Sequence, residues 1–114
     1  MSWRALEFEA EPRPAEAMVE WLAGLLAPRG VTVLSAKETD WGLELTVRVG
    51  ARKTLLGIGR LEGSRRTYRA FTRPPQILDH LLGFGRVRTR EAVLKALEEA
   101  LGAEGRRPRW VELG

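Results

Sequence analysis

The chain has 114 residues, of which 44% are hydrophobic and 30% are charged, with a formal net charge of +4. This composition suits one globular domain with its own core and excludes a disordered chain. Cysteine is absent, which excludes disulfides, thiolate metal sites and cysteine nucleophiles. The longest run without a charge, residues 21–28, is too short to span a bilayer, so we expect a cytoplasmic protein without a membrane partner.

The first two predicted elements are a strand and a helix. Residues 3–9 alternate in polarity, with Leu6 and Phe8 on one side, which predicts a short strand. Apolar residues recur at helical spacing through residues 14–27, and Pro14 suits the first helical position. This second pattern is typical of an amphipathic helix.

Four further strands are predicted next along the chain. They cover residues 31–37, 41–49, 53–61 and 67–72. The alternation is clearest in the second of these, where Trp41 is expected to share one face with the aliphatic residues at every second position. Turn residues separate the segments, so we expect an antiparallel meander, with the first strand of the chain joining it at an edge.

The C-terminal part predicts two more helices and a tail. A short apolar stripe over residues 77–82 indicates a second helix, which Gly83 would end. Thr89 suits the N-terminal cap of a third helix, which Gly102 would end. A basic tail follows at about residues 103–114. The order β-α-β-β-β-β-α-α predicts a single α+β domain, in which three helices cover one face of an antiparallel sheet of four to five strands.

A seven-residue motif occurs twice, as LLGIGRL at residues 55–61 and as LLGFGRV at residues 81–87. The first copy lies in a predicted strand and the second at a predicted helix end, and the flanking residues differ, so no longer repeat is indicated. A phosphate-binding loop presents backbone N–H groups at the N-terminus of a following helix, and the dinucleotide-binding fingerprint has the spacing G-x-G-x-x-G. The first copy has neither feature, so we interpret the motif as a coincidence or as local packing.

Candidate catalytic residues are few. His80 is the one histidine, and its neighbour Asp79 would point about 100° away on a helix, so the two do not form a dyad. Glu38, Asp40 and Glu44 could gather at a turn as a magnesium or general-acid cluster, although charged turns are usually solvated. We therefore expect no cofactor and no metal site, and we keep an enzyme that uses the acidic cluster or His80 as the last alternative.

Charge is distributed unevenly along the sequence. Residues 1–51 contain five basic and eight acidic residues, whereas residues 52–114 contain fourteen basic and seven acidic residues. Arginine supplies sixteen of the nineteen basic residues and asparagine is absent, a composition that resembles proteins of thermophiles, so the arginine count alone is weak evidence for binding. The position of the positive charge is more informative, because such asymmetry favours an anionic partner.

The basic residues concentrate in a predicted hairpin and in the tail. Alternation places Arg69, Phe71 and Arg73 on one face of the hairpin and Tyr68 on the other. An aromatic ring among guanidinium groups suits single-stranded nucleic acid, because arginine binds phosphates and aromatic rings stack on bases. Either aromatic could instead fill the core, and Trp110 could dock the tail. The predicted anion-binding residues are Arg60, Arg65, Arg66, Tyr68, Arg69, Arg73, Arg106, Arg107, Arg109 and Trp110.

The sequence therefore predicts a non-enzymatic binding domain whose arginine-rich surface meets nucleic acid or an acidic protein. The main alternative is a self-associating module, because four tryptophans are many for this length and tryptophan is enriched at interfaces. If the second face of the sheet leaves Trp41, Leu55 or Leu61 exposed, a homodimer would cover it.

Overall fold

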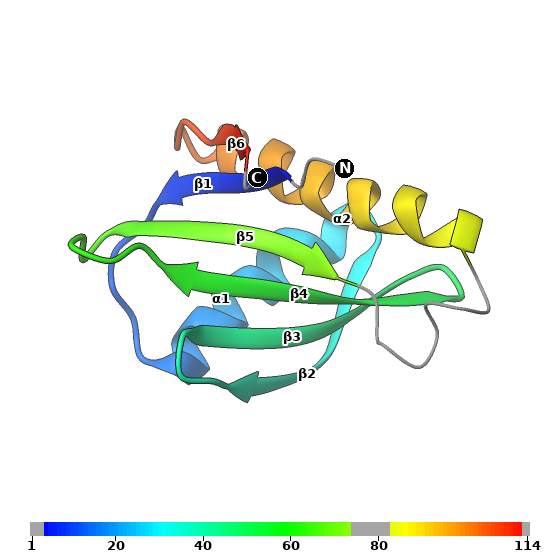
Figure 1. Cartoon of the computed structure of the whole chain (residues 1–114), viewed down its shortest axis with the longest axis horizontal. Helices are drawn as coiled ribbons and strands as arrows, with labels where there is room; N and C mark the ends of the chain where they lie inside the picture. The colour runs from blue at the N-terminus through cyan, green and yellow to red at the C-terminus, as the bar shows by residue number, and fades with distance from the viewer. Residues whose placement is uncertain (1–3, 74–82, 113–114) are drawn as a thin grey trace.

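A computed structural model describes residues 4–73 and 83–112 of the chain. Their fold is α+β, with one antiparallel sheet of six strands and two α-helices (Figure 1). The strands are β1 (Arg4–Glu9), β2 (Val31–Glu38), β3 (Gly42–Val49), β4 (Arg52–Arg60), β5 (Thr67–Arg73) and β6 (Arg109–Glu112). Their order in the sheet is β2-β3-β4-β5-β1-β6. The helices are α1 (Ala15–Leu26), followed by the 3₁₀ turn η1 (Ala27–Arg29), and α2 (Gly83–Ala103).

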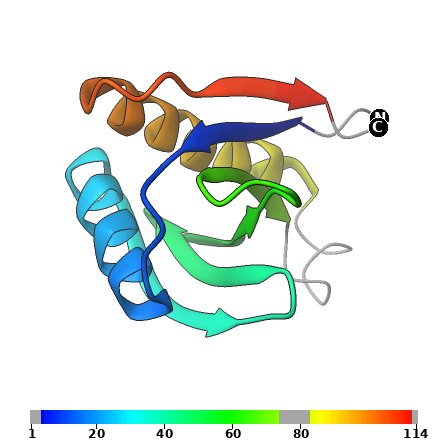
Figure 2. The ribbon, with the colours of Figure 1, turned by 90° about the vertical axis from the view of Figure 1, so that its left-hand side faces the viewer.

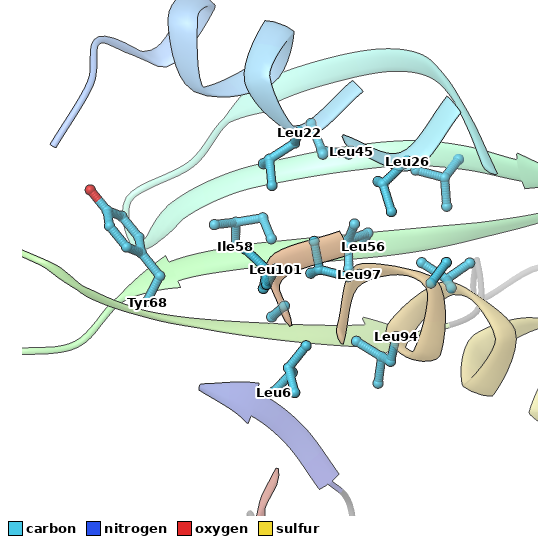
Figure 3. Close-up of a cluster of buried hydrophobic side chains, with 14 of the residues drawn as sticks. Leu6, Leu22, Leu26, Leu45, Leu56, Ile58, Tyr68, Leu94, Leu97 and Leu101 are labelled. Carbon is cyan, nitrogen blue, oxygen red and sulfur yellow. The ribbon is translucent and has the colours of Figure 1, made fainter. Parts of the chain in front are cut away.

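Both helices pack on the same face of the curved sheet (Figure 2). The predicted alternation is confirmed in β3 and β4, where apolar residues at alternate positions along the strand are buried beneath the helices. The helices contribute residues three and four positions apart, as their amphipathic patterns predict. Figure 3 shows this core, which includes Leu6, Leu22, Leu26, Leu45, Leu56, Ile58, Leu94, Leu97 and Leu101.

The position of β1 corrects one expectation from the sequence. We expected β1 at an edge of the sheet, but it lies between β5 and β6 and pairs with both. The extra strand comes from the predicted tail, of which residues 109–112 form β6. Only two of these four residues are apolar, so the segment is too short to give a period-two signal of its own.

The C-terminal helix begins earlier than expected. Gly83 does not end a helix but begins α2, so Thr89 lies within the helix and not at its cap. The helix ends at a Schellman turn, in which Gly105 has a φ of +78° and the N–H of Arg106 donates to the carbonyl of Leu101 at 3.0 Å. The helix predicted over residues 77–82 lies outside the described residues. Neither described helix is long and apolar enough to cross a membrane.

Candidate nucleic-acid interface

The face of the sheet opposite the helices, here called the open face, contains a row of paired side chains. Directly opposed residues of antiparallel strands point to the same face. Pairing aligns Gly59 of β4 with Arg69 of β5, then Glu7 of β1, then Arg109 of β6. In the next row along β4 and β5, Gly57 lies opposite Phe71. The two glycines of the first LLGIGRL copy therefore leave space on the open face.

Two aromatic rings occupy that space, and we call them the aromatic platform (Trp41 and Phe71). Their ring centroids lie 5.3 Å apart, with 47° between the ring planes. The Trp41 side chain lies against Gly59, where an added Cβ would be 3.8 Å from its Cε3 atom. Trp41 is 41% exposed and Phe71 is half-buried. The platform thus offers aromatic surface to solvent.

Gly42 explains why Trp41 lies on the open face and not, as expected, on the same side as Leu43. The φ of Gly42 is +154°, and a Cβ there would overlap the carbonyl oxygen of Ile58, so the position requires glycine. The turn before it is closed by a hydrogen bond from the Thr39 N–H to the Gly42 carbonyl at 2.8 Å. Because the chain turns at this point, the alternation of β3 does not extend to Trp41.

A pair of glycine variants tests the packing of the platform. A Cβ at Gly57 would overlap the Phe71 ring, at 2.6 and 2.9 Å from two of its carbons, whereas at Gly59 the nearest atoms are at ordinary contact distances. We expect Gly57→Ala to displace the ring, to lower the free energy of unfolding by about 1 kcal/mol, and to change the near-ultraviolet circular dichroism. Gly59→Ala, the matched control, should change neither property. Equal effects of the two variants would show that Phe71 does not depend on the space at Gly57.

Glu7 is buried between two arginines of the open face. The Arg109 Nη2 and Nε atoms donate to Oε1 of Glu7 at 2.6 and 3.0 Å, and the Arg69 Nε atom donates to Oε2 at 3.0 Å. The hydrogen bonds from Arg109, and then those from Arg69, lower the pKa of the Glu7 carboxyl, while burial opposes this shift. The carboxylate therefore orients both guanidinium groups and neutralises part of their charge.

Other predicted cations remain exposed without an ionic partner. Within residues 4–73 and 83–112, no side-chain hydrogen bond or ion pair involves the guanidinium groups of Arg60, Arg65, Arg66 and Arg107. Arg60 and Arg69 line a hollow of about 400 Å³ together with the aromatic platform. Arg69 borders this hollow from the open face, and Arg60 borders it from the end of β4, where it pairs with Tyr68.

The remaining predicted residues have structural contacts. Tyr68 is buried in the core, and its ring stacks on that of Phe8 at 5.8 Å, so Phe71 is the aromatic of this hairpin that faces outward. Trp110 packs against the core, and its Nε1 atom donates to Glu98 at 2.7 Å, which matches the docked alternative for the tail. Arg106 forms ion pairs with two glutamates. The side chain of Arg73 lies outside the described part of the chain.

The residues considered for catalysis do not form a cluster in the described structure. No group of three or more histidine, aspartate or glutamate side chains in the described ranges could bind a metal ion, and this includes the turn with Glu38, Asp40 and Glu44. Asp79 and His80 lie outside those ranges. The acidic-cluster hypothesis therefore has no geometric support.

Sequence reasoning missed two residues of the open face, Trp41 and Glu7. The sequence placed Trp41 on the buried side or at a dimer interface, and it gave no signal that Glu7 is buried.

Comparison with known proteins finds no matching family model, no matching curated protein and no matching solved structure.

Proposed function

We propose that the open face binds single-stranded nucleic acid in the cytoplasm, with bases on the aromatic platform and phosphates at the neighbouring arginines. The observation that supports this proposal is the exposure of Trp41 beside Phe71, at a hollow that Arg60 and Arg69 also line. Unstacked bases pack on exposed aromatic rings whatever their sequence, because every base has a π face.

The combination of rings and charge favours single strands over other anionic partners. Bases in a duplex are stacked on one another, so a flat aromatic surface reaches only bases that are unpaired. An acidic protein would use the exposed arginines but would gain little from two adjacent rings. A neutral ligand would use the rings but would gain nothing from Arg60, which has no ionic partner among the described residues.

Substitution of Trp41 tests the proposal directly. We expect Trp41→Ala to weaken binding of a fluorescein-labelled oligothymidine at least about fivefold, because one stacked base contributes about 1–3 kcal/mol. Trp41→Phe retains a ring and should recover most of the affinity. Fluorescence anisotropy at low salt measures the three dissociation constants, and circular dichroism checks that each variant is folded.

Salt dependence and a charge control complete this experiment. The logarithm of the affinity should fall linearly with the logarithm of the salt concentration, as phosphate contacts require. Arg60→Ala should weaken binding, whereas Lys95→Ala, which removes the same charge from an exposed position on α2, should have a smaller effect. Affinity that does not depend on salt, or that is equal in wild type and Trp41→Ala, would rule the proposal out.

Self-association through the same face is the second candidate function. Trp41 and Leu34 are the large hydrophobic residues that are exposed in the described ranges, and a second copy of the chain could cover Trp41. Sedimentation equilibrium over a wide concentration range distinguishes the two functions. A monomer at every concentration rejects the homodimer.

A further inference from the structure

A second hollow lies next to the aromatic platform, at the end of β1. This cleft has a volume of about 760 Å³, and it is lined by the end of β1 and the residues after it, by the β4–β5 hairpin, and by the connection from α2 to β6. Since β1 lies between β5 and β6, Arg66 directly before β5 and Arg107 shortly before β6 flank the end of β1 from both sides.

Hydrogen bonds connect the segments on both sides of the cleft to the end of β1 and the residues that follow it. The Ala10 N–H donates to the Arg66 carbonyl at 2.9 Å. On the other flank, the Arg106 Nη1 atom donates to the Glu9 carbonyl at 3.1 Å, and its Nη2 atom donates to the Glu11 carboxylate at 2.9 Å. The backbone and Arg106 therefore shape the cleft, and the guanidinium groups of Arg66 and Arg107 are not needed for it.

The side chains of the cleft leave a positive charge without a partner. The lining contains four arginines and three glutamates. Two of the arginines bind two of the glutamates: Arg109 binds Glu7 and Arg106 binds Glu11. In the part of the chain that the structure describes, the charges left without an ion pair are those of Arg66, Arg107 and Glu9.

The cleft adjoins the hollow at the platform. Leu61 lines both of them. Glu7 links the two, because it binds Arg69 of the hollow through one oxygen and Arg109 of the cleft through the other. From β4 to β1 the sheet extends over two strand spacings, about 10 Å. A chain of several nucleotides can cover this distance, whereas a single base on the platform cannot.

We infer that a nucleic-acid strand bound at the aromatic platform continues into this cleft, where Arg66 and Arg107 bind a phosphate beyond the stacked base. The inference rests on the proposed function and adds to it the path and the minimum length of the ligand. Each guanidinium group can donate two parallel hydrogen bonds to a phosphate, so arginines on opposite sides of a backbone can hold the same phosphate. Glu9 weakens the site, since its carboxylate repels the phosphate.

Oligothymidines of two lengths test the path, a trimer and an oligomer of about ten residues, which lies within the usual size of such sites. The double variant Arg66→Ala/Arg107→Ala should weaken binding of the longer oligomer about tenfold and leave the trimer unchanged. Its plot of log affinity against log salt should be shallower by about 0.7, since the loss of one phosphate contact in a single strand removes about 0.7 from the slope. Glu9→Gln should strengthen binding of the longer oligomer only.

The control variant Arg29→Ala/Lys95→Ala removes two charges from exposed positions outside both hollows and should have a smaller effect on either oligomer. If Arg66→Ala/Arg107→Ala binds the longer oligomer as the wild type does, or weakens both oligomers equally, the path through the cleft is wrong while the platform stands. If the wild type binds neither oligomer, the proposed function fails, and the inference with it.

Discussion

Leu97→Ala is expected to lower the free energy of unfolding by about 2–5 kcal/mol, the range measured when a buried leucine side chain is removed. Leu97 is fully buried on α2, among the leucines of the core (Figure 3). This helix contacts β1, β3, β4 and β5 as well as α1. The cavity left by the Leu97 side chain would therefore border most of the core. Neighbouring elements of the sheet are fixed by their own pairing and can relax into the cavity only in part.

Urea denaturation followed by circular dichroism measures this loss as a change in midpoint at an unchanged slope. Lys95→Ala is the matched control, because it lies two residues away on the same helix but is exposed, and it should stay within about 0.5 kcal/mol of the wild type. A loss below 1 kcal/mol for Leu97→Ala would mean that α2 is not part of the cooperative core.

The elements that could be predicted from the sequence are those with one buried face. The helical spacing of α1 and the alternation of β3 are both direct consequences of burial on one side, so their bounds agree with the structure to within two residues. The α+β class then follows, because these amphipathic faces must cover one another. Periodicity alone does not show which strands pair with one another, which is why the place of β1 between β5 and β6 was not predicted.

The boundaries that could not be predicted depend on tertiary contacts. α2 begins at Gly83 although glycine is a poor helix former, so the local preference of that residue does not locate the start of the helix. β6 forms because the pairing with β1 and the hydrogen bond from Trp110 to Glu98 attach it to the rest of the chain. Neither contact is visible in a local window of the sequence.

The candidate site also combines features that the sequence predicts with features that depend on tertiary contacts. Counting charges identified the arginine-rich hairpin and the segment before β6, but it could not show that Arg69 and Arg109 share a carboxylate from a strand far away in the sequence. The exposure of Trp41 depends on the backbone turn at Gly42, a conformation that the alternation of β3 does not reveal. The surface proposed for binding is therefore smaller than the list of basic residues suggested.

Glu7→Gln is expected to lower the free energy of unfolding at pH 7 by about 2 kcal/mol, because a buried carboxylate that accepts three hydrogen bonds from arginines loses its charge. Arg69 and Arg109 are partly exposed, which limits the effect through solvent screening. The folded state lowers the pKa of Glu7 below the usual value of 4.5. The stabilisation is thus fully present above about pH 4.5 and is lost as the pH falls through the lower pKa of the folded state.

Urea midpoints of the two proteins from pH 7 down to pH 3 measure this dependence, and the curves should converge as the pH falls. The pKa of Glu11 is also lowered, through its hydrogen bond with Arg106, so the difference between the two curves, and not the wild-type curve alone, reports on Glu7. Glu16→Gln removes a carboxylate from an exposed position on α1 and should leave the stability nearly unchanged at every pH. A constant difference between wild type and Glu7→Gln over this range would show that Glu7 stabilises the sheet by its shape, and that its charge does not position the two arginines.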